Sequence, residues 1–261
     1  MSNTILSTSN LKIGYTSKKA DTIISENIIL TLEKGKLISL IGANGIGKST
    51  LLRTITGIQM PISGDVLLND KKIADYTSLQ LAQQLSLVLT ESLPPSNLTV
   101  FELVALGRQP YTNWIGTLTD EDKLKINEAI ELTQIIHLAN KKHYEISDGQ
   151  LQKVLIARAL AQDTPLIILD EPTTHLDLLH KISLFKLLKK LTSETQKCIL
   201  FSTHDIDLAI QLSDEMILMT PQKVLQGQPK ILIQNHAFDD LFQDENIKFD
   251  IEKAKFIFKD L

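Results

Sequence analysis

Short apolar runs and amphipathic stretches alternate along most of the chain. Mainly apolar runs occupy 35–41, 85–89, 166–169 and 199–203. Their length and composition are typical of strands that are buried on both faces of a sheet. Residues 49–55, which follow the first run after a glycine-rich turn, read as a helix. This alternation of buried strands and helices predicts an α/β fold.

Antiparallel β-structure is expected beside this core. Residues 1–34 read as short strands, and 62–73 read as a hairpin that turns at Asn69 and Asp70. Turn-forming residues between two strand-like stretches favour such a hairpin. We therefore expect a small antiparallel β-subdomain.

From about residue 92 the spacing of apolar positions becomes helical. Thr99 is followed by Glu102, which is a capping-box pattern, and Thr119 precedes a stretch with acids in its first turn. These two helix starts predict an inserted helical lobe over about 91–146.

The whole pattern is that of one domain over 1–261. We assign its core to about 1–90 and 147–220, the helical lobe to the residues between them, and a short tail to 221–261. A chain of 261 residues exceeds one average domain but is compatible with one α/β unit that carries an inserted lobe.

Composition and charge exclude several classes of function. Lys and Arg number 27 and Asp and Glu 31, and the net charge of −4 argues against a nucleic-acid-binding protein. Cys198, the single cysteine, reads as a small buried side chain in a reducing compartment. No apolar run approaches the roughly 20 residues that span a bilayer, and no signal peptide is expected. We expect a cytoplasmic chain that acts on a membrane only through a partner.

Residues 42–49 fit the phosphate-binding pattern G-x-x-x-x-G-K-[ST], between a predicted strand and a predicted helix. Its glycines allow backbone N–H groups to point at a polyphosphate, and the helix start adds the positive end of its dipole. Lys48 would reach the β- and γ-phosphates, and the Ser49 hydroxyl could ligate magnesium. A glycine turn without a ligand is the alternative. The nucleotide-binding residues expected here are Gly42, Asn44, Gly45, Gly47, Lys48, Ser49 and Thr50.

Two acidic residues end the apolar run at 166–169. A central strand delivers the residues at its carboxyl end to the ligand crevice of an α/β sheet. Asp170 there would hold magnesium, which takes oxygen ligands. Glu171 is placed to polarise the water that attacks the γ-phosphate. A turn cap before Pro172 is the alternative for both acids.

A second anion-binding turn is predicted at Ser147. This residue precedes the helix-forming stretch 148–160, and the N–H groups at a capped helix start bind anions. The turn, Ile146-Ser-Asp-Gly-Gln150, resembles the L-S-G-G-Q signature of the ATP-binding subunits of ABC transporters. Five motifs occur in the order of that family between about residues 5 and 235.

The resemblance implies a phosphate-loop NTPase (RecA-like) core that works as a homodimer. In that family the signature of one subunit closes on the γ-phosphate held by the phosphate loop of the other. Ser147, Gly149 and Gln150 are therefore expected to face the nucleotide of a second copy. ATP and Mg²⁺ are the implied cofactors.

The resemblance also assigns single residues. Tyr15 matches the aromatic residue that stacks on adenine, a contact that tolerates any base. Asp177 matches the acid of the loop that reaches the partner subunit, and His204 matches the histidine that contacts the γ-phosphate. The implied catalytic residues are Glu171, His204 and Lys48.

The chain departs from the family pattern at two positions. Thr90 stands where a glutamine usually touches magnesium and relays motion to the membrane subunit. A threonine hydroxyl can still ligate magnesium, but it is shorter. Asp148 replaces the first glycine of the signature, and we expect its side chain to point away from phosphate.

Residues 102–114 resemble the corresponding segment of importers for iron–siderophore complexes, haem and cobalamin. The resemblance implies an integral-membrane permease, an extracytoplasmic substrate-binding protein, and a place on the inner face of the cell membrane. We expect Arg108, Tyr111 and Trp114 to be exposed as a protein-binding hot spot. The alternative is a loop whose aromatic residues pack locally.

Other classes of nucleotide-binding protein fit less well. A GTPase would need an N-K-x-D motif, and Asn140-Lys-Lys-His143 lacks the acid. A soluble non-transport ABC ATPase, with a role in iron–sulfur assembly or as a scaffold, is the alternative that the sequence leaves open.

Overall fold

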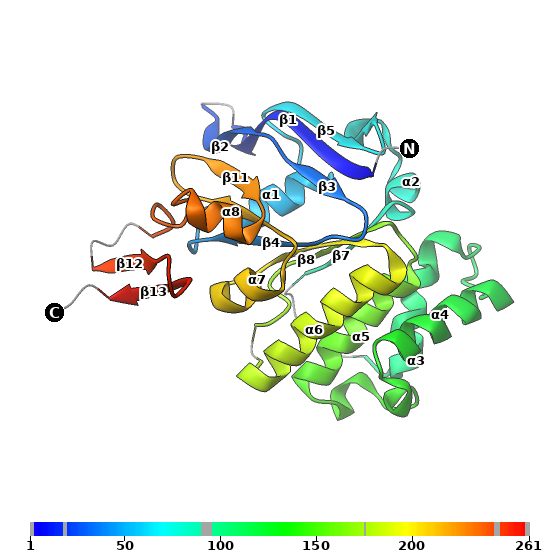
Figure 1. The fold of residues 1–261 in the computed structure, drawn as a ribbon. Helices are drawn as coiled ribbons and strands as arrows, with labels where there is room; N and C mark the ends of the chain where they lie inside the picture. The colour runs from blue at the N-terminus through cyan, green and yellow to red at the C-terminus, as the bar shows by residue number, and fades with distance from the viewer. Residues whose placement is uncertain (1–2, 18–19, 90–95, 175, 243–245, 259–261) are drawn as a thin grey trace.

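The computed structural model describes residues 3–17, 20–89, 96–174, 176–242 and 246–258. A six-stranded sheet lies at the centre, with a smaller antiparallel sheet on one side and most of the helices on the other (Figure 1). The helices are α1 (Lys48–Ile55), α2 (Ser78–Ala82), α3 (Val100–Ala105), α4 (Asp120–Leu132), α5 (Asp148–Ala161), α6 (Leu178–Thr195), α7 (Ile206–Leu212) and α8 (Pro229–Gln234), with short 3₁₀ turns η1 (Ile73–Asp75), η2 (Leu106–Tyr111), η3 (Ile136–Leu138) and η4 (His143–Glu145).

The central sheet has the strand order β11-β10-β4-β9-β8-β7. β11 is antiparallel to β10, and all other neighbours are parallel. Every position of β4, β8 and β9 is buried, as expected for strands that are covered on both faces. The bounds are β4 (Leu37–Gly42), β7 (Leu85–Val88), β8 (Leu166–Leu169), β9 (Cys198–Ser202), β10 (Glu215–Met219) and β11 (Val224–Gly227).

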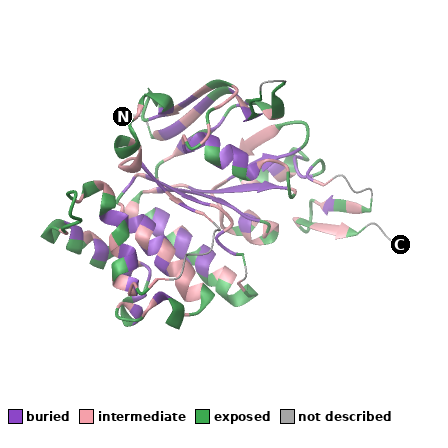
Figure 2. Ribbon diagram, turned by 180° about the vertical axis from the view of Figure 1, so that it is seen from behind, coloured by how far each residue is buried: buried purple, intermediate pink, exposed green. Residues whose placement is uncertain are grey.

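Side chains of the central strands alternate between two cores. In β8, Leu166 and Ile168 join the core shared with α1 and the antiparallel sheet, whereas Ile167 and Leu169 join the core shared with α5 and α6. Figure 2 shows the same arrangement, with buried strands in the middle and the exposed positions of the helices turned outward. This layering holds α1 and α5 on opposite faces of one sheet.

The antiparallel sheet has the order β2-β1-β5-β6, and β3 also pairs with β1. The predicted hairpin is confirmed, because Asn69 and Asp70 join β5 to β6 with φ values of 48° and 62°. Positive φ at both central residues is the geometry of a type I′ turn. The bounds are β1 (Thr4–Tyr15), β2 (Thr22–Ile28), β3 (Thr31–Glu33), β5 (Ser63–Leu68) and β6 (Lys71–Lys72).

Both predicted helix starts of the lobe are confirmed. Thr99 accepts a hydrogen bond from the backbone of Glu102, and the Glu102 carboxylate accepts one from the backbone of Thr99. Thr119 and Asp122 form the same reciprocal pair at the start of α4. The predicted α/β class with an antiparallel subdomain and inserted helices is thus confirmed.

The residues beyond 220, for which the sequence predicts only a tail, contain regular structure. β11 extends the central sheet, and β12 (Ile247–Asp250) pairs with β13 (Lys255–Phe258). Phe249 of this hairpin stacks on Phe238, with ring centroids 4.5 Å apart. The domain boundaries near residues 90, 146 and 220 stay predictions. Among the described helices, none is long and apolar enough to cross a membrane.

Candidate functional site

The phosphate loop joins β4 to α1. Gly45 and Gly47 have φ values of 76° and 111°, a backbone region that residues other than glycine rarely adopt. A Cβ atom on Gly47 would lie 2.3 Å from Cγ2 of Ile24, so this position has no room for a side chain. Gly47 is also the N-cap of α1, and no side chain caps the first N–H groups of that helix. These groups suit an anionic ligand.

Lys48 follows this loop as the first residue of α1 and is only 6% exposed. Its Nζ donates to the carbonyl oxygens of Gly42 at 2.9 Å and Ala43 at 3.3 Å. Burial lowers the pKa of Lys48, while the charges of Glu171 and Asp170 act in the opposite direction. The ammonium group therefore lies near both acidic residues that follow β8.

Tyr15 lies beside the phosphate loop. Its hydroxyl is 3.2 Å from Oγ1 of Thr50 in α1, and about half of the residue, 52%, is exposed. The hydrogen bond fixes the ring next to the helix that starts at Lys48. An exposed ring in this place is available for stacking on a base.

Asp170 and Glu171 are held by one buried hydroxyl. Ser202, at the end of β9, donates from Oγ to Oδ1 of Asp170 at 2.6 Å and accepts from the backbone N–H of Glu171 at 2.8 Å. The N–H of Asp170 donates to the carbonyl of Val88 in β7. Glu171 has a left-handed backbone with φ of 46°, which is uncommon for a residue other than glycine.

Glu171 and His204 are in direct contact. Nε2 of His204 lies 2.7 Å from Oε1 of Glu171, and Oγ1 of Thr174 donates to Oε2 at 3.3 Å. Both side chains are partly exposed. The carboxylate therefore reaches solvent from a fixed position beside an imidazole, as a general base for water requires.

Ser147 is the N-cap of α5, as predicted. Its hydroxyl accepts from the N–H of Gln150, and its own N–H donates to the Gln150 side chain. Asp177 is the N-cap of α6 and accepts from the N–H of His180 at 2.9 Å. Gly149 lies against the start of α6, because a Cβ there would be 3.1 Å from Cδ2 of His180.

The expected site residues thus form two groups within one chain. The first surrounds the phosphate loop and includes Tyr15, Asp170, Glu171 and His204. The second surrounds Ser147, Gly149, Gln150 and Asp177. In the part of the chain that the structure describes, no hydrogen bond joins the Ser147–Gln150 turn to the phosphate loop. Thr90 and His175 lie outside the described residues.

The donor set of the first group suits magnesium. The Asp170 carboxylate and the Ser49 hydroxyl offer oxygen atoms, the ligand type that Mg²⁺ prefers. Within the described ranges no three His, Cys, Asp or Glu side chains cluster as a closed metal site. A site with few protein ligands fits an ion that keeps waters and substrate phosphates in its shell.

The sequence reasoning missed Ser202 and the acid after His204. Asp205 accepts from Thr173 at 2.8 Å and from Lys181 at 2.8 Å, and so ties the loop after β8 to the loop after β9. The available signal was the run of polar residues that ends the apolar strand at 198–201. Nothing in the linear sequence shows that β8 and β9 are neighbours.

The expectation for Arg108 was wrong. This side chain is 4% exposed, and its Nε donates to Asp122 at 2.8 Å while Nη1 donates to the carbonyl of Ala161 at 2.9 Å. Its guanidinium also lies over the ring of Tyr111, 4.0 Å from the centroid. A buried cation requires such partners, so Arg108 belongs to the packing of the lobe. Trp114 is exposed as expected, at 94%.

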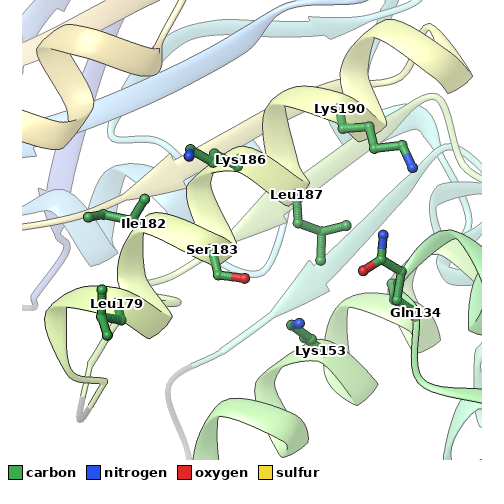
Figure 3. A pocket seen from close by; sticks show the side chains of 9 residues that line it. Gln134, Lys153, Leu179, Ile182, Ser183, Lys186, Leu187 and Lys190 are labelled. Carbon is green, nitrogen blue, oxygen red and sulfur yellow. The ribbon is translucent and has the colours of Figure 1, made fainter. Parts of the chain in front are cut away.

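A separate groove of about 430 Å³ lies between α5 and α6 (Figure 3). Neither the phosphate loop nor the Ser147–Gln150 turn contributes to it, so it is distinct from the nucleotide site. Its lining is basic and carries no carboxylate; it consists of Thr133, Gln134, Lys153, Leu179, Ile182, Ser183, Lys186, Leu187 and Lys190.

The fold and the first group of residues define a phosphate-loop nucleoside triphosphatase, because a glycine loop between β4 and a helix lies near the Asp–Glu pair that follows β8, two strands along the same parallel sheet. Within this class the chain belongs to the ABC transporter family, whose model matches residues 25–174.

Proteins with similar sequences or structures match this chain along most of its length. An ABC transporter ATP-binding protein of Methanocaldococcus jannaschii is 42% identical over 246 residues, which cover 94% of this chain and 83% of the relative. The iron(3+)-hydroxamate import ATP-binding protein FhuC of Bacillus subtilis is 40% identical over 221 residues, covering 85% of this chain and 81% of the relative. The dimeric structure of a bacterial ABC transporter cassette superposes with a TM-score of 0.73 at 28% identity, covering 86% of this chain and 99% of that chain.

The chain is therefore an ABC-type ATP-binding subunit, an ATPase of the kind that powers transport. The predicted phosphate-loop NTPase fold and the predicted family are confirmed.

Proposed function

We propose that this chain powers an importer for an iron(III)–siderophore complex, as one of two identical ATP-binding subunits. The observation that carries the choice of cargo is the 40% identity to an iron(3+)-hydroxamate import ATP-binding protein along 85% of the chain. The relatives named above are transporter subunits, which favours this function over a soluble non-transport ATPase.

Two copies would share each ATP. The phosphate loop of one copy binds the triphosphate, and Ser147, Gly149 and Gln150 of the second copy close on the γ-phosphate. The separation of the two groups within one chain supports this arrangement, since a second phosphate cradle serves no ligand on its own chain. The similarity to a dimeric cassette structure supports it as well.

Hydrolysis would depend on three side chains of the first group. Glu171 accepts a hydrogen bond from the attacking water and polarises it. His204, which is in contact with Glu171, and Lys48, which lies in the loop, stabilise the charge that develops on the transferred phosphoryl group. Tyr15 stacks on adenine, and Asp177 reaches the partner copy.

Asp170 and Ser49 would hold Mg²⁺, with Thr90 as a third proposed ligand, and the ion when bound neutralises charge on the β- and γ-phosphates. Ser202 positions the Asp170 carboxylate for this role through its 2.6 Å hydrogen bond.

The membrane partner would be an integral permease, with an extracytoplasmic substrate-binding protein on its other side. Trp114 is 94% exposed and the adjacent Ile115 is 68% exposed, which is unusual for side chains of this size. Together they form an apolar surface on the lobe that suits a helix of a permease. This contact would place the chain on the inner face of the cell membrane.

The test is purification of the tagged chain from gently solubilised membranes, followed by mass spectrometry. We expect a multi-helix permease at about one copy per copy of this chain. Trp114→Ala should reduce that recovery, whereas Leu124→Ala, which alters another exposed apolar residue of the lobe, should not. Cells that carry the Glu171→Gln chain should also fail to take up a labelled iron(III)–hydroxamate complex. Recovery of soluble partners only would contradict the transport function.

A further inference from the structure

His180, in the first turn of α6, contacts both parts of the second group, which are Asp177 and the Ser147–Gln150 turn. Its Nδ1 is 2.8 Å from Oδ1 of Asp177, the same oxygen that accepts from the His180 backbone N–H at 2.9 Å. Because a carboxylate only accepts hydrogen bonds, Nδ1 carries the proton in this contact. The backbone N–H and then the imidazole of His180 lower the pKa of Asp177. The carboxylate therefore stays ionised, and two donors of one residue fix it.

The opposite edge of the imidazole faces Gly149 in the Ser147–Gln150 turn, which we call the signature turn. A Cβ atom on Gly149 would lie 3.1 Å from Cδ2 of His180 and 3.6 Å from Cδ2 of Leu176. Gly149 has no positive φ, so its backbone alone would accept another residue. The neighbouring imidazole limits the space at this position, and the start of α5 lies directly against the start of α6.

The Asp177 loop also leads back to the phosphate site. Thr174, three positions before Asp177, donates to Oε2 of Glu171 at 3.3 Å. A displacement of the Ser147–Gln150 turn would therefore press on His180, which holds Asp177. Among the described residues, the His180 side chain thus contacts both parts of the second group, and Thr174 of the preceding loop contacts Glu171 of the first group.

We propose that His180 is a positioning residue for ATP hydrolysis, which holds Asp177 with one edge of its imidazole and supports the signature turn at Gly149 with the other. The inference rests on the proposed sharing of ATP between two copies. When the signature turn binds the γ-phosphate on a second copy, His180 keeps Asp177 in place to meet that copy. The residue acts through Asp177 and Gly149 and does not touch the nucleotide.

Substitutions at His180 separate its two contacts. His180→Asn keeps a donor near the place of Nδ1 and removes the ring edge that faces Gly149, and His180→Ala removes both. We expect the turnover number of ATP hydrolysis to fall about tenfold in His180→Ala and less in His180→Asn. ATP affinity of the single chain, measured by calorimetry, should stay within about twofold, since the phosphate loop is untouched.

His236 provides a matched control. It makes the same contact with an acid three residues along the chain, with Nδ1 3.0 Å from Asp239, and it is equally exposed but belongs to the C-terminal part. His236→Asn should leave the turnover number at the wild-type value. A loss of turnover in His236→Asn as large as in His180→Ala would show that any such exposed pair matters, and would overturn the inference.

The contact with Gly149 is tested by a double-mutant cycle on the turnover number. Gly149→Ala should cost more with His180 present than in the His180→Ala background, where the new methyl group has room. Equal fold losses in both backgrounds would overturn a role for His180 at the signature turn.

Dimer formation separates this inference from the proposed function. In the Glu171→Gln background with ATP, size-exclusion chromatography should give a dimer, and His180→Ala should reduce its amount. If no dimer forms even with His180, the sharing of ATP between copies is wrong. If the dimer forms equally with and without His180, only the role of His180 is wrong.

Discussion

Ser202 joins the two acidic residues that follow β8. Its single hydroxyl binds the Asp170 carboxylate and the Glu171 backbone at the same time, and it is fully buried. Without that bond, the left-handed backbone of Glu171, with φ of 46°, would lose a partner in the neighbouring strand.

We expect Ser202→Ala to lower the turnover number of ATP hydrolysis about tenfold or more, because Glu171 and Asp170 lose their common anchor. The unpaired N–H should also cost about 1–3 kcal/mol of stability. Ser39→Ala is the control, since the Ser39 hydroxyl is buried in β4 without a hydrogen-bond partner among the described residues. Steady-state kinetics and urea unfolding of both variants provide the check. A Ser202→Ala chain that turns over ATP like wild type would contradict this role.

The site residues that could be predicted from the sequence are those whose structural partners are close to them in the chain. Gly47, Lys48 and Ser147 belong to contiguous motifs, and the backbone geometry that they need is local. Ser202 is 32 positions from Asp170, and the contact exists because β8 and β9 are adjacent in the sheet. No local pattern encodes that adjacency.

At the scale of elements, the helical lobe depends on a buried ion pair. Arg108 in η2 and Asp122 in α4 are each almost fully buried, and Arg108 also binds the last turn of α5. Thr119 and Thr99 mark the helix starts in the sequence, since capping boxes are local. The partner of Arg108 is set by how η2 packs on α4 and α5, which is why the sequence suggested an exposed arginine.

Arg108→Met should destabilise the chain by about 3–5 kcal/mol, because it leaves the Asp122 carboxylate buried without its cation. Adding Asp122→Asn to that variant should recover part of the loss. Lys123→Met, which breaks an exposed pair with Asp120, should change stability by less than about 1 kcal/mol. Urea unfolding compares the three variants. A loss in Arg108→Met no larger than in Lys123→Met would contradict the structural role of the pair.

The same pair gives a pH dependence with a definite sign. Burial acts to raise the pKa of Asp122, but hydrogen bonds from Thr119 and Arg108 outweigh it, so the folded-state pKa lies below the usual value. The stabilisation is complete above the unfolded-state pKa of about 3.9 and is lost as the pH falls toward the folded-state value. The difference in unfolding free energy between wild type and Asp122→Asn should therefore shrink between about pH 5 and pH 3. A difference that grows over this range would contradict the assignment.

At the scale of the whole molecule, the layers of the fold keep the phosphate loop and the Ser147–Gln150 turn apart. The phosphate loop lies with α1 on one face of the central sheet, and the signature turn begins α5 on the other (Figure 1). In the proposed arrangement, a chain built in this way completes an ATP site only with a second copy.

The sequence predicted the buried strands of the central sheet, because 166–169 and 199–203 have a clear apolar pattern, but not which helices cover which face. It did not predict β11 and the β12–β13 hairpin. Their strands are short and only partly buried, so their apolar pattern is weak. They form because β10 offers an unpaired edge and because Phe238 and Phe242 offer aromatic partners. Both causes are tertiary contacts, which the local sequence pattern does not encode.

The most direct test of the account is the oligomeric state of the Glu171→Gln chain with ATP, measured by size-exclusion chromatography with light scattering. The amide keeps the size of the carboxylate but is a poor base, so we expect ATP to be bound without turnover and the chain to elute as a dimer with twice its own mass. Glu128→Gln, a change of an exposed glutamate in α4, should hydrolyse ATP normally and leave no trapped dimer. Hydrolysis at the wild-type rate by Glu171→Gln, or a monomer at saturating ATP, would contradict the account.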